Sequence, residues 1–247
     1  MRITVLGACG AWPTPGQACS GFLVEYEGFQ LIIDLGYATV PRLLEWTSAE
    51  RIDAVLISHG HPDHCADLNP LLRARALGED PPAPLPVHAL PGALDAVLAL
   101  DRPETLAGSY TLSEFDGGAR FRVGPFEIHV RLLPHWVPNA GMRITAGGRT
   151  VTYTGDTGPS PDVIELARNA DLLIADATFV EHVPRADAPF LTSARQAGEQ
   201  ATAAGAGNLL LSHLWPGTDA DAARESAARR FSGGVQVAQT GVRLDTG

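Results

Sequence analysis

The chain has 247 residues, of which 45% are hydrophobic, and its 28 Asp and Glu outnumber its 18 Lys and Arg to give a net charge of −10. This hydrophobic share is ordinary for a globular protein with a sizeable core, and we expect one domain spanning 1–247. The acidic balance argues against a large nucleic-acid footprint, because such a surface needs clustered cations to displace counterions. We expect a small-molecule substrate instead, and an anionic one remains possible.

The chain begins with an apolar strand pattern at 2–6 and has no apolar run of 18 residues. We therefore expect a cytoplasmic protein with neither a signal peptide nor a membrane span. Cys9, Cys19 and Cys65 are odd in number and lack C-x-x-C spacing. This pattern favours reduced thiols over a disulfide framework.

Strand and helix patterns follow one another along the whole chain. Strands are predicted at 2–6, 20–26, 29–34, 53–57, 119–123, 126–133, 141–146, 149–154, 171–175, 208–212 and 235–238. Helices are predicted at 38–47, 66–76, 160–168, 192–204 and 219–230, and a short strand and helix within 86–100. Two β-rich halves flanked by helices indicate an α/β protein, a four-layer αββα sandwich with two sheets face to face and helices outside. Helical arginines such as Arg75 are interpreted as solvated.

An H-x-H-x-D-H string, made by His59, His61, Asp63 and His64, directly follows the apolar strand pattern 54–58. Neutral imidazole suits zinc and similar metals, and carboxylate completes such shells. The first two histidines are two residues apart, so extended backbone points both to one side. Asp63 and His64 lie where a turn into a helix can direct their side chains toward a second metal position. Two ions about 3.5–4 Å apart would accept this set, which is the arrangement of two-metal hydrolases.

Three further candidate ligands stand at the ends of predicted strands. His135 ends the run that starts at Ile128, Asp156 follows a β-branched strand with a Gly turn, and His213 follows the strand 208–212. Loops at strand ends are common places for chemistry. Together with the histidine-rich string, the three indicate a complete dinuclear site.

In order and context, these motifs resemble the metallo-β-lactamase superfamily. The resemblance rests on Leu6-Gly7-Ala8-Cys9-Gly10, Ile32-Ile33-Asp34-Leu35-Gly36, the H-x-H-x-D-H string, Pro134-His135, Thr154-Gly155-Asp156-Thr157-Gly158 and Leu211-Ser212-His213. The N-terminal stretch, with Pro13-Thr14-Pro15 and Ser20-Gly21-Phe22-Leu23-Val24, is similar to that of the ribonuclease Z branch and its bacterial phosphodiesterase relatives, including cyclic-nucleotide phosphodiesterases. The resemblance implies a single metallo-β-lactamase-fold domain and allows a homodimer.

The resemblance also implies a role for each ligand. His59, His61 and His135 would hold the first metal, Asp63, His64 and His213 the second, and Asp156 would bridge both. Asp34 would orient the loop or a ligand histidine through hydrogen bonds. The two divalent ions, zinc by default with manganese or iron as alternatives, would form a bridging hydroxide that attacks the substrate. Asp63 would also help to steer that hydroxide.

The general acid is where the chain departs from the ribonuclease Z pattern. Asp176 replaces the Glu of the family's His-Glu-Ala-Thr string, and Leu191 aligns with a second family histidine. An apolar side chain cannot donate a proton, so Asp176 and His182 are the candidate acids. Only 20 residues separate His135 from Asp156. This interval is too short for the arm with which tRNA-processing enzymes grip tRNA, so tRNA 3′ processing is not expected.

Three functions remain open from the sequence. The first is a phosphodiesterase acting on a small nucleotide, cyclic nucleotides included. The second is an ester, lactone or thioester hydrolase, whose leaving group would tolerate Leu191 better. The third is a repurposed metal protein. Trp136 and Trp215, each one or two residues after a proposed ligand, would form an apolar pocket mouth with Phe190 and Leu191.

Overall fold

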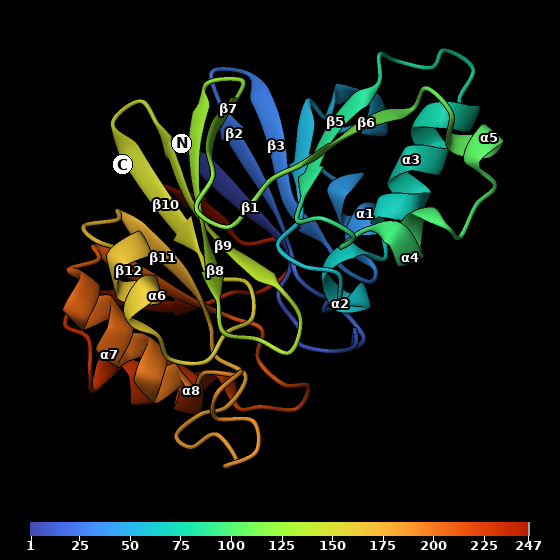
Figure 1. Cartoon of the computed structure of the whole chain (residues 1–247). Coiled ribbons are helices and arrows are strands. Elements are labelled where there is room, and N and C mark those ends of the chain that lie inside the picture. The colour runs from blue at the N-terminus through green and yellow to red at the C-terminus, as the bar shows by residue number, and fades with distance from the viewer. Residues whose placement is uncertain (247) are drawn as a thin grey trace. The chain divides into compact units, whose positions relative to one another are not determined.

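Two seven-stranded mixed sheets organise the computed structural model, which describes residues 1–246 (Figure 1). Each sheet belongs to its own compact unit. We call residues 2–116 with 239–245 the first unit, and residues 117–238 with Met1 and Thr246 the second unit. That 1–247 forms one domain stays a prediction, and its last residue, Gly247, lies outside the described residues.

The first unit contains the sheet with strand order β14-β1-β2-β3-β4-β5-β6. Its strands are β1 (Arg2–Gly7), β2 (Gly21–Tyr26), β3 (Phe29–Leu35), β4 (Ala54–Leu56), β5 (Leu85–Ala89), β6 (Tyr110–Glu114) and β14 (Arg243–Asp245). Pairing is antiparallel from β14 to β3 and parallel from β3 to β6. Its helices are α1 (Thr39–Leu43), the 3₁₀ helix η1 (Ala49–Arg51), α2 (Pro62–Cys65), α3 (Leu68–Leu77), α4 (Asp95–Leu98) and α5 (Pro103–Leu106).

The sheet of the second unit likewise has an antiparallel part and a parallel part, and its strand order is β13-β12-β11-β10-β9-β8-β7. Its strands are β7 (Arg120–Val123), β8 (Phe126–Leu133), β9 (Asn139–Ala146), β10 (Arg149–Tyr153), β11 (Leu172–Asp176), β12 (Asn208–Ser212) and β13 (Gly234–Val237). Pairing is antiparallel from β7 to β10 and parallel from β10 to β13. Its helices are α6 (Pro161–Leu166), α7 (Ala194–Ala204) and α8 (Ala220–Ala228).

The central parallel strands of both sheets are deeply buried. Strands β4 and β11 are buried along their whole length, as expected for parallel strands covered on both faces. In the first unit, leucines of α3 pack with residues of β3 and β4 in one apolar cluster. In the second unit, alanines of α7 and α8 pack with leucines of β11 and β12. Small alanine side chains let these helices approach the sheet closely.

Most predicted elements are present, and the differences have identifiable causes. The helix predicted at 66–76 is present as α3, which begins at Leu68, and the short helix α2 before it was not predicted. The two helices are separate because the N–H of Asp67 donates to Leu35 O rather than to a helical carbonyl. The helix predicted at 38–47 ends at Leu43, where the backbone continues in turns. Strands β6 and β14 and helix α5 were not predicted, since they are short and largely exposed. Arg75 is buried, not solvated, and donates to three backbone carbonyls.

The topology places the predicted site residues at the carboxyl ends of strands within each unit. Asp34 lies near the end of β3 and His59 follows β4 in the first unit. Asp156 follows β10 and His213 follows β12 in the second. The carboxyl ends of parallel strands are the usual ligand sites of open α/β sheets. Within residues 1–246, no helix is both long and apolar enough to cross a bilayer.

Candidate metal centre

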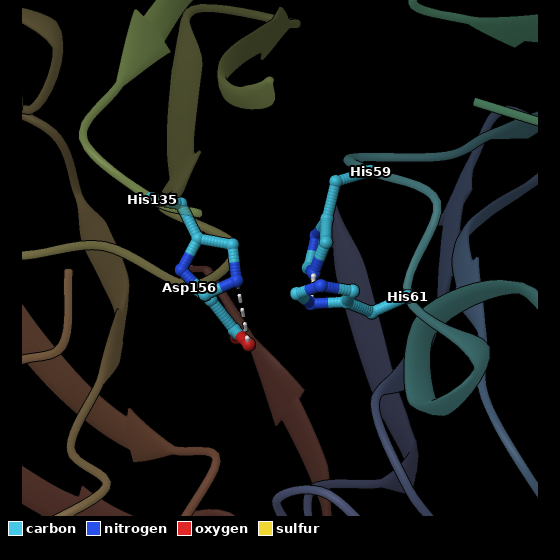
Figure 2. Close-up of side chains that lie close together, drawn as sticks. All are labelled: His59, His61, His135 and Asp156. Carbon is cyan, nitrogen blue, oxygen red and sulfur yellow. Dashed lines mark hydrogen bonds and ion pairs between the residues drawn. The ribbon is translucent and has the colours of Figure 1, made fainter. Parts of the chain in front are cut away.

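His59 and His61 face each other across the loop that follows β4 in the first unit. Figure 2 shows the two rings from this loop pointing toward one another, and His59 Nε2 lies 3.1 Å from His61 Nδ1. Two nitrogens bound to one tetrahedral zinc at about 2.0–2.1 Å lie about 3.3–3.4 Å apart. The observed separation is therefore close to that of two ligands of one ion.

Hydrogen bonds determine which ring nitrogen of His59 is available to bind a metal ion. Ser58 Oγ donates to Asp34 Oδ2 at 2.7 Å, so it accepts from His59 Nδ1, which lies 3.0 Å away. This places the proton of His59 on Nδ1 and leaves the lone pair on Nε2. Ser58 N also donates to Asp34 Oδ1 at 2.7 Å, which fixes the carboxylate in turn. Such hydrogen bonds are the usual support of a metal-binding histidine.

His64 is oriented by the same carboxylate. Its Nδ1 lies 2.7 Å from Asp34 Oδ2, and its Nε2 lies 3.7 Å from Asp63 Oδ2. Because an ionised carboxylate only accepts hydrogen bonds, His64 donates from Nδ1 and presents Nε2 on the side of Asp63. Asp63 and His64 both contribute to a group of potential ligand atoms within 4.8 Å of one another. The first unit thus offers two pairs of oriented ligands.

The backbone around these residues is strained and closely packed. Asp34 has φ of 57°, a left-handed conformation that is uncommon for a residue with a side chain. Gly36 lies so close to the backbone of Asp63 that an added Cβ would be 1.9 Å from Asp63 O. The N–H of Ala11 donates to Asp63 Oδ2 at 2.8 Å. Strain of this kind persists where the surroundings over-determine a conformation, often at functional sites.

In the second unit, Asp156 is held by a buried asparagine. Asn139 Nδ2 donates to the carbonyls of Thr154 and Asp156 at 2.9 and 2.7 Å, which fixes the loop after β10. Gly155 between them has φ of 58° and a Cβ there would meet Asn139 Oδ1 at 2.3 Å, so only glycine fits. His135 Nε2 lies 3.8 Å from Asp156 Oδ2, and a dashed line in Figure 2 marks this pair.

His135 has its tautomer set by a backbone carbonyl. Its Nδ1 lies 3.1 Å from Phe190 O. A carbonyl only accepts hydrogen bonds, so His135 donates from Nδ1 and keeps its lone pair on Nε2, the nitrogen on the side of Asp156. His135 therefore has the same arrangement as His59 and His64.

His213 is the fourth histidine oriented in this way. Its Nδ1 lies 3.0 Å from Thr178 Oγ1, and that hydroxyl donates to Asp176 Oδ1 at 2.7 Å. The hydroxyl therefore accepts from His213, whose Nε2 lies 3.2 Å from Asp156 Oδ2. Like Asp34, His213 has a left-handed backbone, with φ of 59°. The second unit thus presents two imidazoles, His135 and His213, each of which has its Nε2 within 4 Å of the Asp156 carboxylate.

Asp176 is a buried junction of the second unit. Beside the Thr178 hydroxyl, it accepts hydrogen bonds from the N–H groups of Thr178, Thr157 and Thr192. Burial raises the pKa of Asp176 to about 7, with His213 opposing the rise and Asp156 adding to it. Its carboxylate therefore connects the loop of Asp156, the strand end at Thr178 and the segment before α7.

The other acid candidate and the aligned leucine lie in different surroundings. His182 is exposed and lies close enough to Glu181 to lower the pKa of that carboxyl, after contributions from Ser226 and Arg229. Leu191 is buried. His182 is therefore a surface residue. The assignment of a general acid stays a prediction.

Aromatic rings surround His135 and follow His213. Trp136 is 51% exposed, and its ring lies 5.0 Å from that of His135 and 5.2 Å from that of Phe190, between centroids. Trp215 is 40% exposed and stacks on Phe179 at 6.4 Å. Exposed aromatic pairs next to candidate ligands are suited to contact an apolar or ring-shaped part of a substrate.

Sequence reasoning missed Ser58, Thr178 and Asn139. Each is a polar residue within or beside a strand that orients a candidate ligand through its side chain. The available signal was their position: Ser58 precedes His59 directly, and Thr178 follows Asp176 by two residues. Asn139 had no such signal, since its contacts are 15 and 17 residues away along the chain.

Comparisons with known proteins agree with this geometry. Residues 31–214 match the family model described as Beta-lactamase superfamily domain. The chain is 33% identical over 244 residues to the probable metallo-hydrolase YhfI of Bacillus subtilis, covering 98% of each protein. The crystal structure of YhfI, a metallo-β-lactamase fold protein, matches with a TM-score of 0.90 at 32% identity over 99% of each chain.

Ribonucleases Z are also similar. The chain is 29% identical, over an alignment 298 positions long, to ribonuclease Z of Haloarcula marismortui, covering 98% of this chain and 96% of that protein. The short form of human tRNase Z matches with a TM-score of 0.80 at 22% identity over 100% of each chain, a likeness of fold alone. These findings confirm the predicted α/β class and the resemblance to the ribonuclease Z branch. The fold has two mixed sheets flanked by helices.

Proposed function

Since the chain belongs to the β-lactamase superfamily, we propose that it is a hydrolase dependent on two divalent metal ions, and a phosphodiesterase on a small nucleotide-like substrate. The observation that supports this most strongly is the common orientation of His59, His64, His135 and His213. In each, an oxygen holds Nδ1 and leaves Nε2 with its lone pair. One histidine in this state is common, whereas three in the loops after strands and one in α2 form a ligand set.

We propose the ligand assignment that the resemblance implies. His59, His61 and His135 would hold one ion, Asp63, His64 and His213 would hold the other, and Asp156 would be shared by both. The contacts within each unit support it, because all seven side chains offer a ligand atom close to another one in the same unit. An imidazole-rich shell favours zinc, with manganese or iron as the alternatives.

The bound ions would supply a nucleophile from water at neutral pH and stabilise negative charge on the substrate oxygens. The chain's own groups hold this centre in place. Asp34 orients His64 directly and His59 through Ser58, and Asp176 orients His213 through Thr178. Because Asp176 is buried and already accepts four hydrogen bonds, we assign it this positioning role and leave His182 as the candidate proton donor.

A small substrate is supported by the chain segment between His135 and Asp156. Strands β9 and β10, joined by a two-residue turn at Gly147 and Gly148, occupy this interval almost completely. No inserted arm is present there to hold a large RNA. The net charge of −10 agrees with this substrate size, because an extended nucleic-acid footprint requires clustered cations.

Hydrolysis of an ester, lactone or thioester is the second candidate, and Leu191 favours it. This buried side chain stands where the related family pattern has a histidine, so the site lacks that proton donor. Leaving groups that need little protonation would react without it. Phosphodiesters with alkoxide leaving groups depend more on an acid or on a metal.

Metal analysis and a substrate panel on one purified sample test both candidates. We expect about two metal ions per chain. Hydrolysis of bis-p-nitrophenyl phosphate and 3′,5′-cyclic AMP, but not of p-nitrophenyl acetate or a lactone, supports the phosphodiesterase. The reverse pattern selects the second candidate. His59→Ala and Asp156→Ala are expected to lose metal and activity together, and full activity in either variant contradicts the ligand assignment.

A further inference from the structure

A second cluster of cationic side chains lies on the antiparallel part of the second unit's sheet. Residues that alternate along a strand share a face, and directly paired residues on neighbouring strands share it too. By this rule one face of β7, β8 and β9 presents five potential cations and one carboxylate: Arg120, Arg122, Glu127, His129, Arg131 and Arg143. None of them is a proposed ligand of the metal centre.

His129 stands between two arginines in the strand register. It pairs with Arg120 of β7 on one side and with Arg143 of β9 on the other. Side chains of directly paired residues have Cβ atoms about 4.5–5.5 Å apart, and like charges at that distance repel. Three potential cations in one row across three strands therefore need a counter-charge.

The protein's own carboxylates form ion pairs at the edges of this face, whereas in the central row Asp171 acts on Arg143 from beyond ion-pair distance and only partly opposes the effect of burial on the pKa of Arg143. Arg122 pairs with Glu127 at 3.2 Å, and Arg131 pairs with Asp162 at 2.8 Å. Arg143 donates instead to the backbone carbonyls of Leu166 and Arg168. Within residues 1–246, neither Arg120 nor Arg143 has a carboxylate at ion-pair distance.

The same row borders a hollow in the surface. Its volume is about 400 Å³, and it is lined by Arg120, Phe121, Arg122, Glu127, Ile128, His129, Arg143 and Thr145. This size is at the lower end of small-molecule sites, which run from about 300 to 1,000 Å³. Arg120 is exposed at its rim, whereas His129 and Arg143 are half-buried.

We propose that this hollow is an anion site that binds the phosphate monoester group of a small molecule between Arg120 and Arg143, over His129. Guanidinium groups bind phosphate oxygens through two parallel N–H donors, and two of them flank a third donor here. A dianion matches two guanidinium groups beside a protonatable imidazole better than a singly charged phosphodiester does. The row is only three strands wide and is bordered by Glu127 and Asp162, which excludes an extended polyanion.

The surroundings of His129 provide a local reporter for this site. Burial lowers the pKa of His129, and the charges of Arg120, Arg131 and Arg143 lower it further. A dianion bound over the ring would oppose those charges and raise the pKa. Phosphate bound at the metal centre would not touch His129, so the signal of its ring distinguishes the two sites.

Titration of the purified protein with methyl phosphate at pH 7.5, followed by NMR of the histidine rings, tests the proposal. The His129 signal is assigned by its loss in His129→Gln. We expect a saturable shift of this signal and a rise of about one unit in its pKa. Dimethyl phosphate, a monoanion, is expected to produce neither.

Two arginine variants make the test specific. Arg120→Gln removes an exposed side chain without an ion pair, so folding is preserved, and affinity is expected to fall about tenfold. Arg149→Gln is the matched control, because Arg149 is an exposed arginine on β10 that pairs with Asp171 outside the hollow. No saturable shift in the parent protein, or equal weakening by both variants, would overturn the proposal.

Discussion

His64 Nδ1 lies 2.7 Å from Asp34 Oδ2, and both side chains are completely buried. The same carboxylate accepts hydrogen bonds from the N–H and the hydroxyl of Ser58, and that hydroxyl in turn accepts from His59. One carboxylate therefore determines the tautomers of two candidate metal ligands. It does so from a left-handed backbone position, which indicates that its placement is maintained at a conformational cost.

Asp34→Asn tests this relationship. The carboxylate accepts at both oxygens, from the Ser58 N–H at Oδ1 and from the Ser58 hydroxyl and His64 at Oδ2. An amide replaces one of these oxygens with an NH₂ group, which cannot accept, so it cannot hold all three donors. We expect metal affinity to fall about 10- to 100-fold, the usual effect of losing such a partner, as measured by competition with a coloured chelator. Asp221→Asn, an exposed carboxylate on α8, is the control and should leave affinity unchanged. Parent-like affinity in Asp34→Asn would contradict the orienting role.

Asn139→Ala tests the asparagine that fixes the loop of Asp156. The substitution leaves two buried carbonyls, of Thr154 and Asp156, without their donor. We expect a loss of about 2–4 kcal/mol in the free energy of unfolding, measured by urea denaturation, because each unsatisfied buried group costs about 1–3 kcal/mol. Asn208→Ala removes a similar bond to Asp171 O at an exposed position and should cost much less. Equal losses in both variants would show that Asn139 has no special role.

His88 provides a pH dependence that is separate from the metal ligands. Burial lowers the pKa of this β5 residue below its ordinary value of 6.5, so the unfolded chain binds the proton more tightly than the folded protein. Stability is then lost as pH falls from 6.5 toward the folded pKa, and it is unaffected by His88 above that window. His88→Gln should flatten this part of the stability curve relative to the exposed-site control His182→Gln. An unchanged slope would show that His88 titrates alike in both states.

The elements predicted best from the sequence are those whose burial produces a periodic or continuous pattern of apolar residues. Strands such as β4 and β11 were recognised because parallel strands covered on both faces consist of apolar runs. The candidate ligands were recognised because His59, Asp156 and His213 directly follow such runs. Strands β6 and β14 were missed because short, exposed edges have no such pattern.

Long-range polar contacts could not be predicted in the same way. The N–H of Asp67, between α2 and α3, donates to Leu35 O, and the side chain of Asn139 donates to the carbonyl of Asp156. Neither contact can be recognised from the neighbouring residues in the sequence. The row of Arg120, His129 and Arg143 could not be predicted from the sequence for a related reason. Its three members lie in three separate strands, and only the strand register brings them side by side.

Trp136→Ala tests whether the aromatic pair beside His135 contacts the substrate, and it presupposes the nucleotide-like substrate proposed above. The ring is half exposed and rests against Phe190, so its loss should not disturb the buried hydrogen bond of His135. Because stacking on a base is worth about 1–3 kcal/mol, KM for 3′,5′-cyclic AMP is expected to rise at least about fivefold with metal content unchanged.

Two further variants separate stacking from general loss of an aromatic ring. Trp136→Phe keeps a stacking face and should recover most of the parent KM. Trp46→Ala removes an exposed tryptophan of the first unit that contacts Arg243, and it should leave KM unchanged. If Trp136→Ala also leaves KM unchanged, the ring only anchors its loop. If metal content falls with activity, Trp136 supports His135 rather than the substrate.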